Sequence, residues 1–554
     1  MNHVLKIISI LILVLSIYSC SKKEKVKIPN NNPNFLVIML DDLGYTDLGC
    51  YGGEINTPNI DSLAYQGVRF TNFKTAAMCA PTRSRFLSGN YNTVAGHGRM
   101  FRGKIDSFYY NKKGYEFNIT DRVVVFPKLL QEAGYYNCIS GKWHLGFNSD
   151  PKDHGFDDSW ILINGYSNHF NNIGINLNGT DTLQQYKSNG KKVSWPKNAF
   201  STEFYTDQMI KFLGNAKTKN KPFFAWVSYT APHWPLQLPK NWLDKKTYKS
   251  TYIDGHEVLR QKRFTSMKEK GIVPATMELP PPMKSLSQWE QFSDTQKKYE
   301  ARKMEIYAGM VENTDFHIGR LIQTLKNNKQ LENTIVLLIS DNGASGHDFY
   351  NHPRGKYARE LYNNEYHNLG SPTSFVGLGP HWANAQSGVF LGYKTWASEA
   401  GITVPFIVSG GNFIKNNLIK TDLLRIEDIA PTILELANVS YPIKRNNKQL
   451  KPMTGKSFAN YLTSKSSNGP HTENTFFASE DRGHAYVRKG DWKIVNFGNA
   501  HNNKDFQLFN LKEDLGERKN VKNNYPEITS ELINYWENFK EEMNVIFPPS
   551  TSTN

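Results

Sequence analysis

This sequence has few cysteines and no long hydrophobic run beyond its first twenty residues. Four cysteines in 554 residues, at positions 20, 50, 79 and 138, are too few for a disulfide-rich scaffold. After residue 20, no stretch approaches the length of a membrane-spanning helix. No internal repeat is present either, which argues against a repeat architecture. The remaining composition, with 39% hydrophobic and 21% charged residues, is that of a soluble globular protein, and the length suggests more than one domain.

The chain is basic, but it has none of the motifs that bind nucleic acid. Sixty-six Lys and Arg residues against 51 Asp and Glu residues give a formal net charge of +15. The basic residues are scattered and form neither a recognition module nor a basic helix, so we expect no nucleic-acid partner. A positive field would also attract a polyanionic substrate, and the charge gives weak support for one.

The N-terminus is typical of an exported bacterial lipoprotein. Lys6 precedes the apolar run 7–17, which is too short to span a membrane but has the length of the hydrophobic part of a signal peptide. Ile-Tyr-Ser-Cys follows as a lipobox, so Cys20 is the predicted lipidation site. A buried core helix is the alternative, but the lysine-rich stretch 21–27 indicates a solvated tether. We therefore expect a lipid anchor in the periplasm, with the outer membrane as the candidate membrane and the cell surface as the alternative location.

Stretches typical of strands alternate with helical stretches over most of the chain. The predicted strands are 35–40, 135–140, 222–229, 334–340 and 404–408. The predicted helices are 58–66, 126–133, 203–213, 298–326 and 427–437. Continuous apolar strands are typical of a sheet buried on both faces. The alternation therefore predicts an α/β fold with a large, mostly parallel central sheet flanked by helices.

After about residue 470 the pattern changes to short strands and one helix. A hairpin over 485–495, a strand over 506–511 and a helix over 528–543 indicate a small α+β domain with an antiparallel sheet. The predicted division of the chain is a signal peptide over 1–19, a tether over 20–33, an α/β domain over 34–440 and a C-terminal α+β subdomain over 441–554. The polar segments expected to be irregular insertions around a site are 101–115, 167–197 and 241–291.

Two polar pairs directly follow predicted strands. Asp41 and Asp42 come after the first strand, and Asp341 and Asn342 come after the fourth. In open α/β sheets, ligands bind at the carboxyl ends of the strands, so both pairs point to the same edge. Three carboxylates and an amide oxygen suit a hard cation such as Ca²⁺ or Mg²⁺. The alternative is a set of turn-forming residues, which are common after strands.

Two histidines and two lysines fall in motifs at or beyond other strand ends. Lys142 and His144 lie in Gly-Lys-Trp-His-Leu-Gly, and His233 lies in Ala-Pro-His-Trp-Pro. Lys394 lies in Gly-Tyr-Lys-Thr-Trp, just before the last predicted strand. A single His is more often a structural residue, and a single Lys is more often a solvated charge. Their positions next to strand ends instead favour a catalytic site.

The run 79–83, Cys-Ala-Pro-Thr-Arg, carries the most specific signal. Taken alone, a cysteine is usually a small buried hydrophobic residue. However, the run has the form Cys-x-Pro-x-Arg, and with the motifs above it resembles the type I sulfatases, in the arylsulfatase group of the alkaline-phosphatase-like superfamily. The motifs occur in order over most of residues 34–410, and the segments 252–277 and 490–493 also resemble bacterial arylsulfatases.

The resemblance implies that 34–440 is a catalytic domain whose nucleophile is made from Cys79. A formylglycine-generating maturation system would convert Cys79 to formylglycine, and the hydrated aldehyde, a geminal diol, would attack the sulfate ester. Arg83 would orient this diol. The residues implied to hold a Ca²⁺ ion are Asp41, Asp42, the modified Cys79, Asp341 and Asn342.

The resemblance also implies roles for the lysines and histidines. Lys142 and Lys394 would bind the sulfate oxygens, where clustered cations stabilise the charge that develops in the reaction. His233 would protonate the leaving oxygen, and His144 would take a proton from the second hydroxyl to release sulfate. The substrate would be an aryl sulfate or a carbohydrate sulfate, and a sulfated glycan fits a periplasmic lipoprotein.

Two other functions stay open on the sequence. A phosphatase or phosphonate monoester hydrolase of the same superfamily would share much of the pattern, although many bind a second metal and this sequence provides one oxygen site. A catalytically dead, glycan-binding lipoprotein would lack a catalytic residue, and every expected position is filled here. With Cys20 lipidated and Cys79 modified, Cys50 and Cys138 remain, either as a disulfide or, as we expect, as two buried thiols.

Overall fold

The computed structural model describes residues 32–101, 103–175, 181–348, 359–411, 414, 417–463 and 468–548. The predicted signal peptide, the predicted lipidation site Cys20 and most of the predicted tether lie outside these residues. Within the described ranges, no helix has both the length and the hydrophobicity required to cross a bilayer. Cys50 and Cys138 are buried free thiols, as expected.

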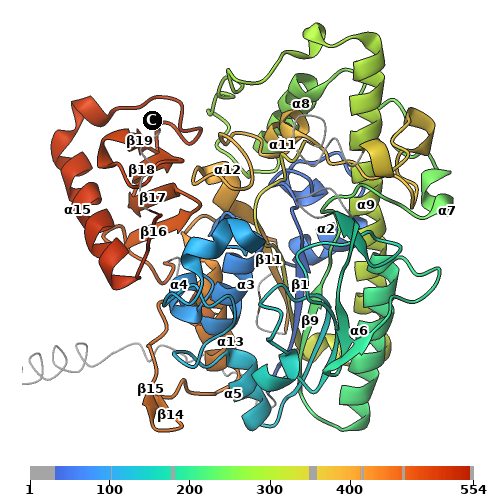
Figure 1. The fold of residues 1–554 in the computed structure, drawn as a ribbon, viewed down its shortest axis with the longest axis vertical. Helices are drawn as coiled ribbons and strands as arrows, with labels where there is room; N and C mark the ends of the chain where they lie inside the picture. The colour runs from blue at the N-terminus through green and yellow to red at the C-terminus, as the bar shows by residue number, and fades with distance from the viewer. Residues whose placement is uncertain are drawn as a thin grey trace, which may run out of the picture. The chain divides into compact units, whose positions relative to one another are not determined.

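An eleven-stranded sheet forms the centre of the large part of the molecule (Figure 1). Five neighbouring strands run parallel to one another. In sheet order they are β10 (Thr334–Ser340), β1 (Asn34–Leu40), β9 (Phe223–Ser228), β3 (Tyr136–Lys142) and β4 (Asp158–Leu162). Beyond β10, β11 (Thr403–Gly410) runs antiparallel to its neighbours β10 and β2 (Gly67–Lys74). The short edge strands are β12 (Leu418–Lys420), β13 (Leu424–Arg425), β7 (Tyr186–Ser188) and β8 (Lys191–Val193).

Helices cover both faces of this sheet (Figure 1). β1 shows why: all seven of its residues are buried, and successive side chains enter two different hydrophobic clusters. The helices on one face are α2 (Pro58–Tyr65), α6 (Ser201–Thr218) and α9 (Asp294–Asn327). Those on the other face are α3 (Cys79–Ser88), α5 (Phe126–Glu132) and α13 (Ile429–Leu436). The predicted α/β fold with a mostly parallel central sheet is confirmed.

A second, antiparallel sheet lies near the C-terminus. Its strands, in order, are β16 (Phe476–Asp481), β17 (His484–Lys489), β18 (Trp492–Phe497) and β19 (Gln507–Asn510). Helix α15 (Pro526–Glu542) packs on one face, where its Trp536 and Ile494 of β18 belong to the same hydrophobic cluster. The opposite face packs through Tyr486 and Val495 against Ala397 and Ile402 of the large part. The predicted C-terminal sheet is confirmed, and the boundary at residue 440 stays a prediction.

Two expectations about individual elements are wrong. The segment 241–291 is not wholly irregular, because it contains helix α8 (His256–Glu269), whose buried side chains include Arg263 as well as apolar residues. The segment 167–197 contains β5 (Ile173–Ile175), β6 (Asp181–Leu183), β7 and β8. Polar residues hide these elements in the sequence, since their buried faces are narrow or partly charged.

Candidate active site

The predicted ligand residues lie at the carboxyl ends of neighbouring strands. β1 pairs in parallel with β10, with Leu40 opposite Ser340, so Asp41 and Asp341 leave the sheet side by side. The backbone N–H of Asp341 donates to the Leu40 carbonyl at 3.0 Å, which ties the two loops together. Asp42 has a left-handed backbone conformation (φ 65°), and its N–H lies 3.4 Å from Asp341 Oδ1.

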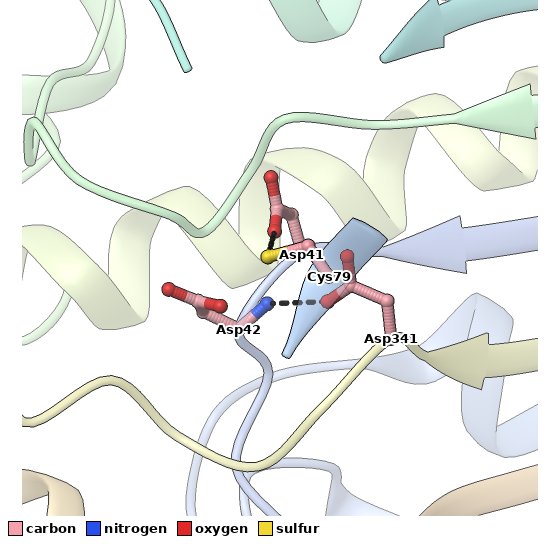
Figure 2. A group of neighbouring side chains, drawn as sticks. All are labelled: Asp41, Asp42, Cys79 and Asp341. Atoms are coloured by element: carbon pink, nitrogen blue, oxygen red, sulfur yellow. Dashed lines mark hydrogen bonds between the residues drawn. The ribbon is translucent and has the colours of Figure 1, made fainter. Parts of the chain in front are cut away.

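Four buried side chains converge at this edge, those of Asp41, Asp42, Cys79 and Asp341 (Figure 2). Each offers one atom that could ligate a metal, and these atoms lie within 4.8 Å of one another. Cys79 is the first residue of α3, and its Sγ lies 3.6 Å from Asp41 Oδ1. Burial, and then the neighbouring Asp341, raise the pKa of Asp41 to about 7. A cation between these carboxylates would relieve their repulsion.

Asn342 adds a further candidate ligand. Its Nδ2 donates to Asp42 Oδ1 at 2.7 Å and to the Gly343 carbonyl at 3.0 Å. Its Oδ1 is buried and has no hydrogen-bond partner among the described residues. Such an oxygen costs free energy unless a ligand satisfies it. Three carboxylates and this amide oxygen are hard ligands, so the site fits Ca²⁺ or Mg²⁺ better than a soft metal.

Three basic side chains face the three carboxylates. The ion pairs are Lys142–Asp41 (2.7 Å), Arg83–Asp341 (2.8 Å) and Lys394–Asp42. Lys394 Nζ also lies 3.1 Å from Cys79 Sγ. Burial disfavours the charge of Lys394, but Asp42 and Cys79 outweigh it and raise the pKa of this lysine. Lys394 therefore stays charged beside the cysteine.

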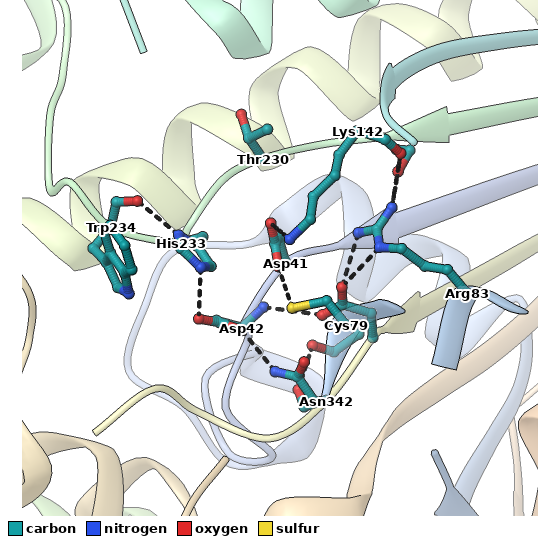
Figure 3. A network of polar contacts seen from close by, with 12 residues as sticks. Asp41, Asp42, Cys79, Arg83, Lys142, Thr230, His233, Trp234 and Asn342 are labelled. Carbon is teal, nitrogen blue, oxygen red and sulfur yellow. Dashed lines mark hydrogen bonds and ion pairs between the residues drawn. The ribbon is translucent and has the colours of Figure 1, made fainter. Parts of the chain in front are cut away.

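Arg83 is held from several sides (Figure 3). Its Nε and Nη2 bind Asp341 Oδ2 at 3.1 and 2.8 Å. Its Nη1 donates to the Lys142 carbonyl at 2.8 Å and to Ser228 Oγ at 2.5 Å. Gly141 (φ 113°) lets β3 approach β9 this closely, because a Cβ there would lie 1.9 Å from the Ser228 carbonyl oxygen. Fixed in this way, Arg83 connects three strand ends.

His233 follows β9 and faces the cluster through Asp42 (Figure 3). Its Nδ1 lies 2.6 Å from the Trp234 carbonyl oxygen, and its Nε2 lies 3.5 Å from Asp42 Oδ2. Burial lowers the pKa of His233, and Asp42 opposes this shift. Oxygen atoms face both ring nitrogens, so a proton on either nitrogen has an acceptor, and a proton on Nε2 is directed toward the cluster.

His144 follows β3, with φ 57°, and lines the same cavity as Cys79. Burial, together with Lys142 and Arg83, holds its pKa well below the ordinary value. Gly165 allows a close approach to the ring, because a Cβ there would lie 2.7 Å from His144 Cε1. A neutral imidazole in this position is able to accept a proton.

A cavity of about 1270 Å³ adjoins the cluster. The predicted site residues that line it are Cys79, His144, His233 and Lys394. The segments 101–115 and 167–197 contribute to its wall, as expected for insertions around a site. No residue of 241–291 lines it, so that expectation is wrong for this segment. Helix α8 instead supports the loop after β1, where Arg263 binds Asp47 at 2.6 Å.

Aromatic side chains form parts of the cavity wall. Trp234 packs against Tyr166 and stacks on His347, with ring centroids 4.3 and 4.9 Å apart. Elsewhere on the wall, Phe101 packs against Phe147, which is 47% exposed. Such flat apolar surfaces suit a ring-shaped ligand.

The structure brings the predicted site residues together, and it also shows several supporting residues that the sequence analysis missed. Ser228 ends a predicted strand, so its position gave a signal that was not used. His169 Nε2 donates to the His233 carbonyl oxygen at 3.0 Å, and His169 lies in a segment expected to be irregular. Arg482 lines the cavity from the turn before β17, although β16 was not predicted.

The fold and the site together define an α/β protein with an acidic, cation-balanced site at the carboxyl edge of its central sheet. A family described as Sulfatase matches residues 33–439, and one described as N-sulphoglucosamine sulphohydrolase, C-terminal, matches residues 389–542. The chain therefore belongs to the sulfatase family, whose members hydrolyse sulfate esters. The family and enzyme class predicted from the motifs are confirmed.

Relatives match the chain over most of its length. An uncharacterized sulfatase of Schizosaccharomyces pombe is 37% identical over 94% of this chain and 95% of its own length. An arylsulfatase of Klebsiella aerogenes is 37% identical over 77% of this chain and 91% of its own length. The N-acetylglucosamine-6-O-sulfatase of Bacteroides thetaiotaomicron is 25% identical over 95% of this chain and 89% of its own length. The crystal structure of Ps i-CgsB in complex with k-i-k-neocarrahexaose shares the fold, with a TM-score of 0.64, 21% identity and coverage of 93% and 94%.

Proposed function

We propose that this chain hydrolyses sulfate esters through a formylglycine made from Cys79 and with the help of a bound Ca²⁺ ion. The observation that carries the proposal is the position of the Cys79 sulfur. It lies 3.6 Å from Asp41 Oδ1 and 3.1 Å from Lys394 Nζ, and the residue lines the cavity. A nucleophile at this point would be next to the metal ligands and to a cation that can bind sulfate.

Cys79 itself is a poor nucleophile in this position. Burial, and then Asp341, raise the pKa of its thiol to about 12. A thiol that keeps its proton attacks weakly. Oxidation by an external formylglycine-generating system, which brings its own oxidant, would remove the thiol. The hydrated aldehyde then supplies one hydroxyl for attack and a second for release of the product.

The surrounding side chains divide the remaining work. Lys142 and Lys394 bind the outer sulfate oxygens and stabilise the charge that grows on them. His233, which faces oxygen atoms on both ring nitrogens, donates a proton to the leaving oxygen. His144, held neutral, accepts a proton from residue 79 when sulfate is released. Arg83, fixed by its bonds to Asp341, orients the hydrated aldehyde of residue 79.

A Ca²⁺ ion fits the four oxygen-bearing residues of the cluster, Asp41, Asp42, Asp341 and Asn342. When bound, it supplies positive charge beside the reacting sulfate group. Among the described residues this is the one cluster of His, Cys, Asp and Glu side chains with metal-ligand spacing. That observation favours the sulfatase over a phosphatase with two metals.

For the substrate, we propose a carbohydrate sulfate. The cavity of about 1270 Å³ is larger than the roughly 300–1,000 Å³ typical of small-molecule sites. Its aromatic walls, with Trp234 and Phe101, suit the apolar faces of sugar rings. The names of relatives support either an aryl sulfate or a carbohydrate sulfate, since one relative is an arylsulfatase and another an N-acetylglucosamine-6-O-sulfatase. We also propose that Cys20 anchors the protein in the periplasm as a lipoprotein.

The test is sulfate release by protein matured with a formylglycine-generating system. Sulfated oligosaccharides, 4-nitrophenyl sulfate and 4-nitrophenyl phosphate would be compared at equal concentration. We expect kcat/KM to be highest for at least one oligosaccharide, lower for the aryl sulfate and lowest for the phosphate. Cleavage of aryl sulfate alone would refute the carbohydrate substrate, and a preference for phosphate would refute the sulfatase mechanism. Binding of oligosaccharide without turnover would identify a dead scaffold.

A further inference from the structure

A second group of buried charges lies where the C-terminal sheet meets the large part of the molecule. We call this group, Lys74, Glu399, Lys493 and Glu517, the support cluster. Lys493 of β18 is 0% exposed, and its Nζ lies 2.8 Å from Glu399 Oε1 and 2.8 Å from Glu517 Oε1. Lys74 binds the other oxygen of Glu399, and Glu517 Oε2 accepts from the Glu399 N–H at 2.6 Å. None of these residues lines the cavity.

The support cluster is connected to both sides of the active site. Glu399 lies five residues after Lys394, at the start of α12 (Glu399–Ile402). Lys74 ends β2, five residues before Cys79. Two residues beyond Glu399, the Gly401 carbonyl accepts from the N–H of Gly343, next to the metal-type ligands. Glu399 therefore joins the segments that carry Lys394 and Cys79.

The loop that carries Lys394 needs such support. Thr395 has φ 80°, a conformation that is unfavourable for a β-branched residue. Strain of this kind persists only where surrounding contacts fix the backbone. The printed contacts are the N–H of Thr395 to the Ala77 carbonyl (3.0 Å) and the N–H of Lys394 to the Ala344 carbonyl (2.9 Å). The C-terminal sheet adds apolar packing, because Tyr486 and Val495 share a cluster with Ala77 and Ala397.

We propose that Lys493 is a positioning residue for Lys394: by holding Glu399 and Glu517 together, the C-terminal sheet fixes the loop that presents Lys394 to the sulfate group. This inference rests on the role proposed for Lys394 above. It gives the C-terminal motif 490–493, which the reaction itself does not use, a function in the reaction. Lys493 acts only through Glu399 and the loop, since the cavity lining does not include it.

A double-mutant cycle in the matured full-length protein tests the proposal. Lys394→Met should lower kcat/KM about 10²–10³-fold, as removal of one charge-stabilising group does. Lys493→Met should lower it about 10- to 100-fold, because misplacement of a binding group costs that much. In the Lys394→Met background, Lys493→Met should lower kcat/KM by less than about a further threefold. The reason is that the group that Lys493 positions, the Lys394 ammonium, is already absent. Thermal unfolding of each variant would confirm that all are folded at the assay temperature.

Controls distinguish a positioning role of Lys493 from a general loss of protein stability. Lys489→Met changes a lysine of the same sheet that is 28% exposed and pairs with Glu531 of α15, and it should leave kcat/KM unchanged. If Lys493→Met does not fold, Glu517→Gln replaces it in the cycle. Equal loss from the Lys493 change in both backgrounds, or no loss in the wild-type background, would overturn the inference. Full activity of Lys394→Met would instead refute the proposed role of Lys394, and the inference with it.

Discussion

Two of the buried ionic groups among the described residues, the cluster at the sheet edge and the support cluster, differ in their access to the cavity. At the sheet edge, three carboxylates face three basic residues, yet the Oδ1 of Asn342 has no partner and a cavity adjoins the group. In the support cluster, each oxygen of Glu399 meets a lysine, and no member lines the cavity. The two groups contain similar charged residues but differ in function. Access from the cavity is the feature of the binding site, whereas the support cluster has no such access and connects two parts of the fold.

The largest effect on activity should come from replacing Cys79, which belongs to the cluster at the sheet edge and not to the support cluster. Cys79→Ala should lower kcat about 10⁴–10⁶-fold, as loss of a nucleophile does, and should leave the unfolding midpoint nearly unchanged. Sulfate release and thermal unfolding measure both. Cys138→Ala is the matched control, because Cys138 is also a buried free thiol but contacts Met209 instead of the site. Residual turnover above about 1% in Cys79→Ala would contradict the account.

Metal removal should affect the site and spare the support cluster. Chelation of the matured protein should lower activity about 100-fold or more, because a metal contributes several kcal/mol to charge stabilisation. Ca²⁺ should restore activity and raise the unfolding midpoint, since it binds the folded chain. A Glu399→Gln protein should show the same rise in midpoint with Ca²⁺. Full activity after exhaustive chelation would show that the carboxylates hold no functional metal.

The support cluster should matter most for stability. Glu399→Gln leaves two buried lysines without their shared carboxylate and should reduce the free energy of unfolding by about 3–5 kcal/mol. Denaturant unfolding measures the change. Glu531→Gln is the matched control: this carboxylate pairs with Lys489 at the surface and should change stability by less than about 1 kcal/mol. Equal effects of the two changes would show that the buried pairing contributes nothing special.

The smallest effect concerns Glu480, a buried carboxylate beside another one. Burial, and then Asp481, raise the pKa of Glu480 to about 8. The folded protein keeps this proton up to about pH 8, while the unfolded chain releases it near pH 4.5, so this group makes stability fall as pH rises between these values. Glu480→Gln should flatten that dependence and stabilise the protein at pH 9 relative to the wild type. An unchanged pH profile of unfolding would contradict the raised pKa.

The sequence predicted much of the sheet because buried strands carry an unmistakable pattern. The run 35–40 is apolar throughout and forms β1, and the polar pairs after β1 and β10 meet because parallel strands end at the same edge. Strand β2 was missed, since Gly67 was interpreted as the end of a helix and also begins the strand. The motif identified Cys79 as a candidate but did not predict its environment. The helix that begins at Cys79, α3, is buried along its whole length.

The supporting contacts could not be predicted, because they join residues far apart in the chain. Lys493 and Glu399 are 94 residues apart, and nothing local in either segment specifies the other. The conformation of Thr395 and the approach of Gly165 to His144 depend equally on packing between segments. The candidate site residues were predicted from motifs, whereas the residues that support them could be identified only from the fold.

Mass spectrometry of the tryptic peptide that contains Cys79 tests the central claim most directly. The peptide would come from protein produced with a formylglycine-generating system and assayed for sulfate release. We predict an aldehyde at residue 79, trapped by a hydrazide reagent, in a fraction that rises in step with specific activity across preparations. Full activity in a preparation whose Cys79 is entirely unmodified would contradict the account.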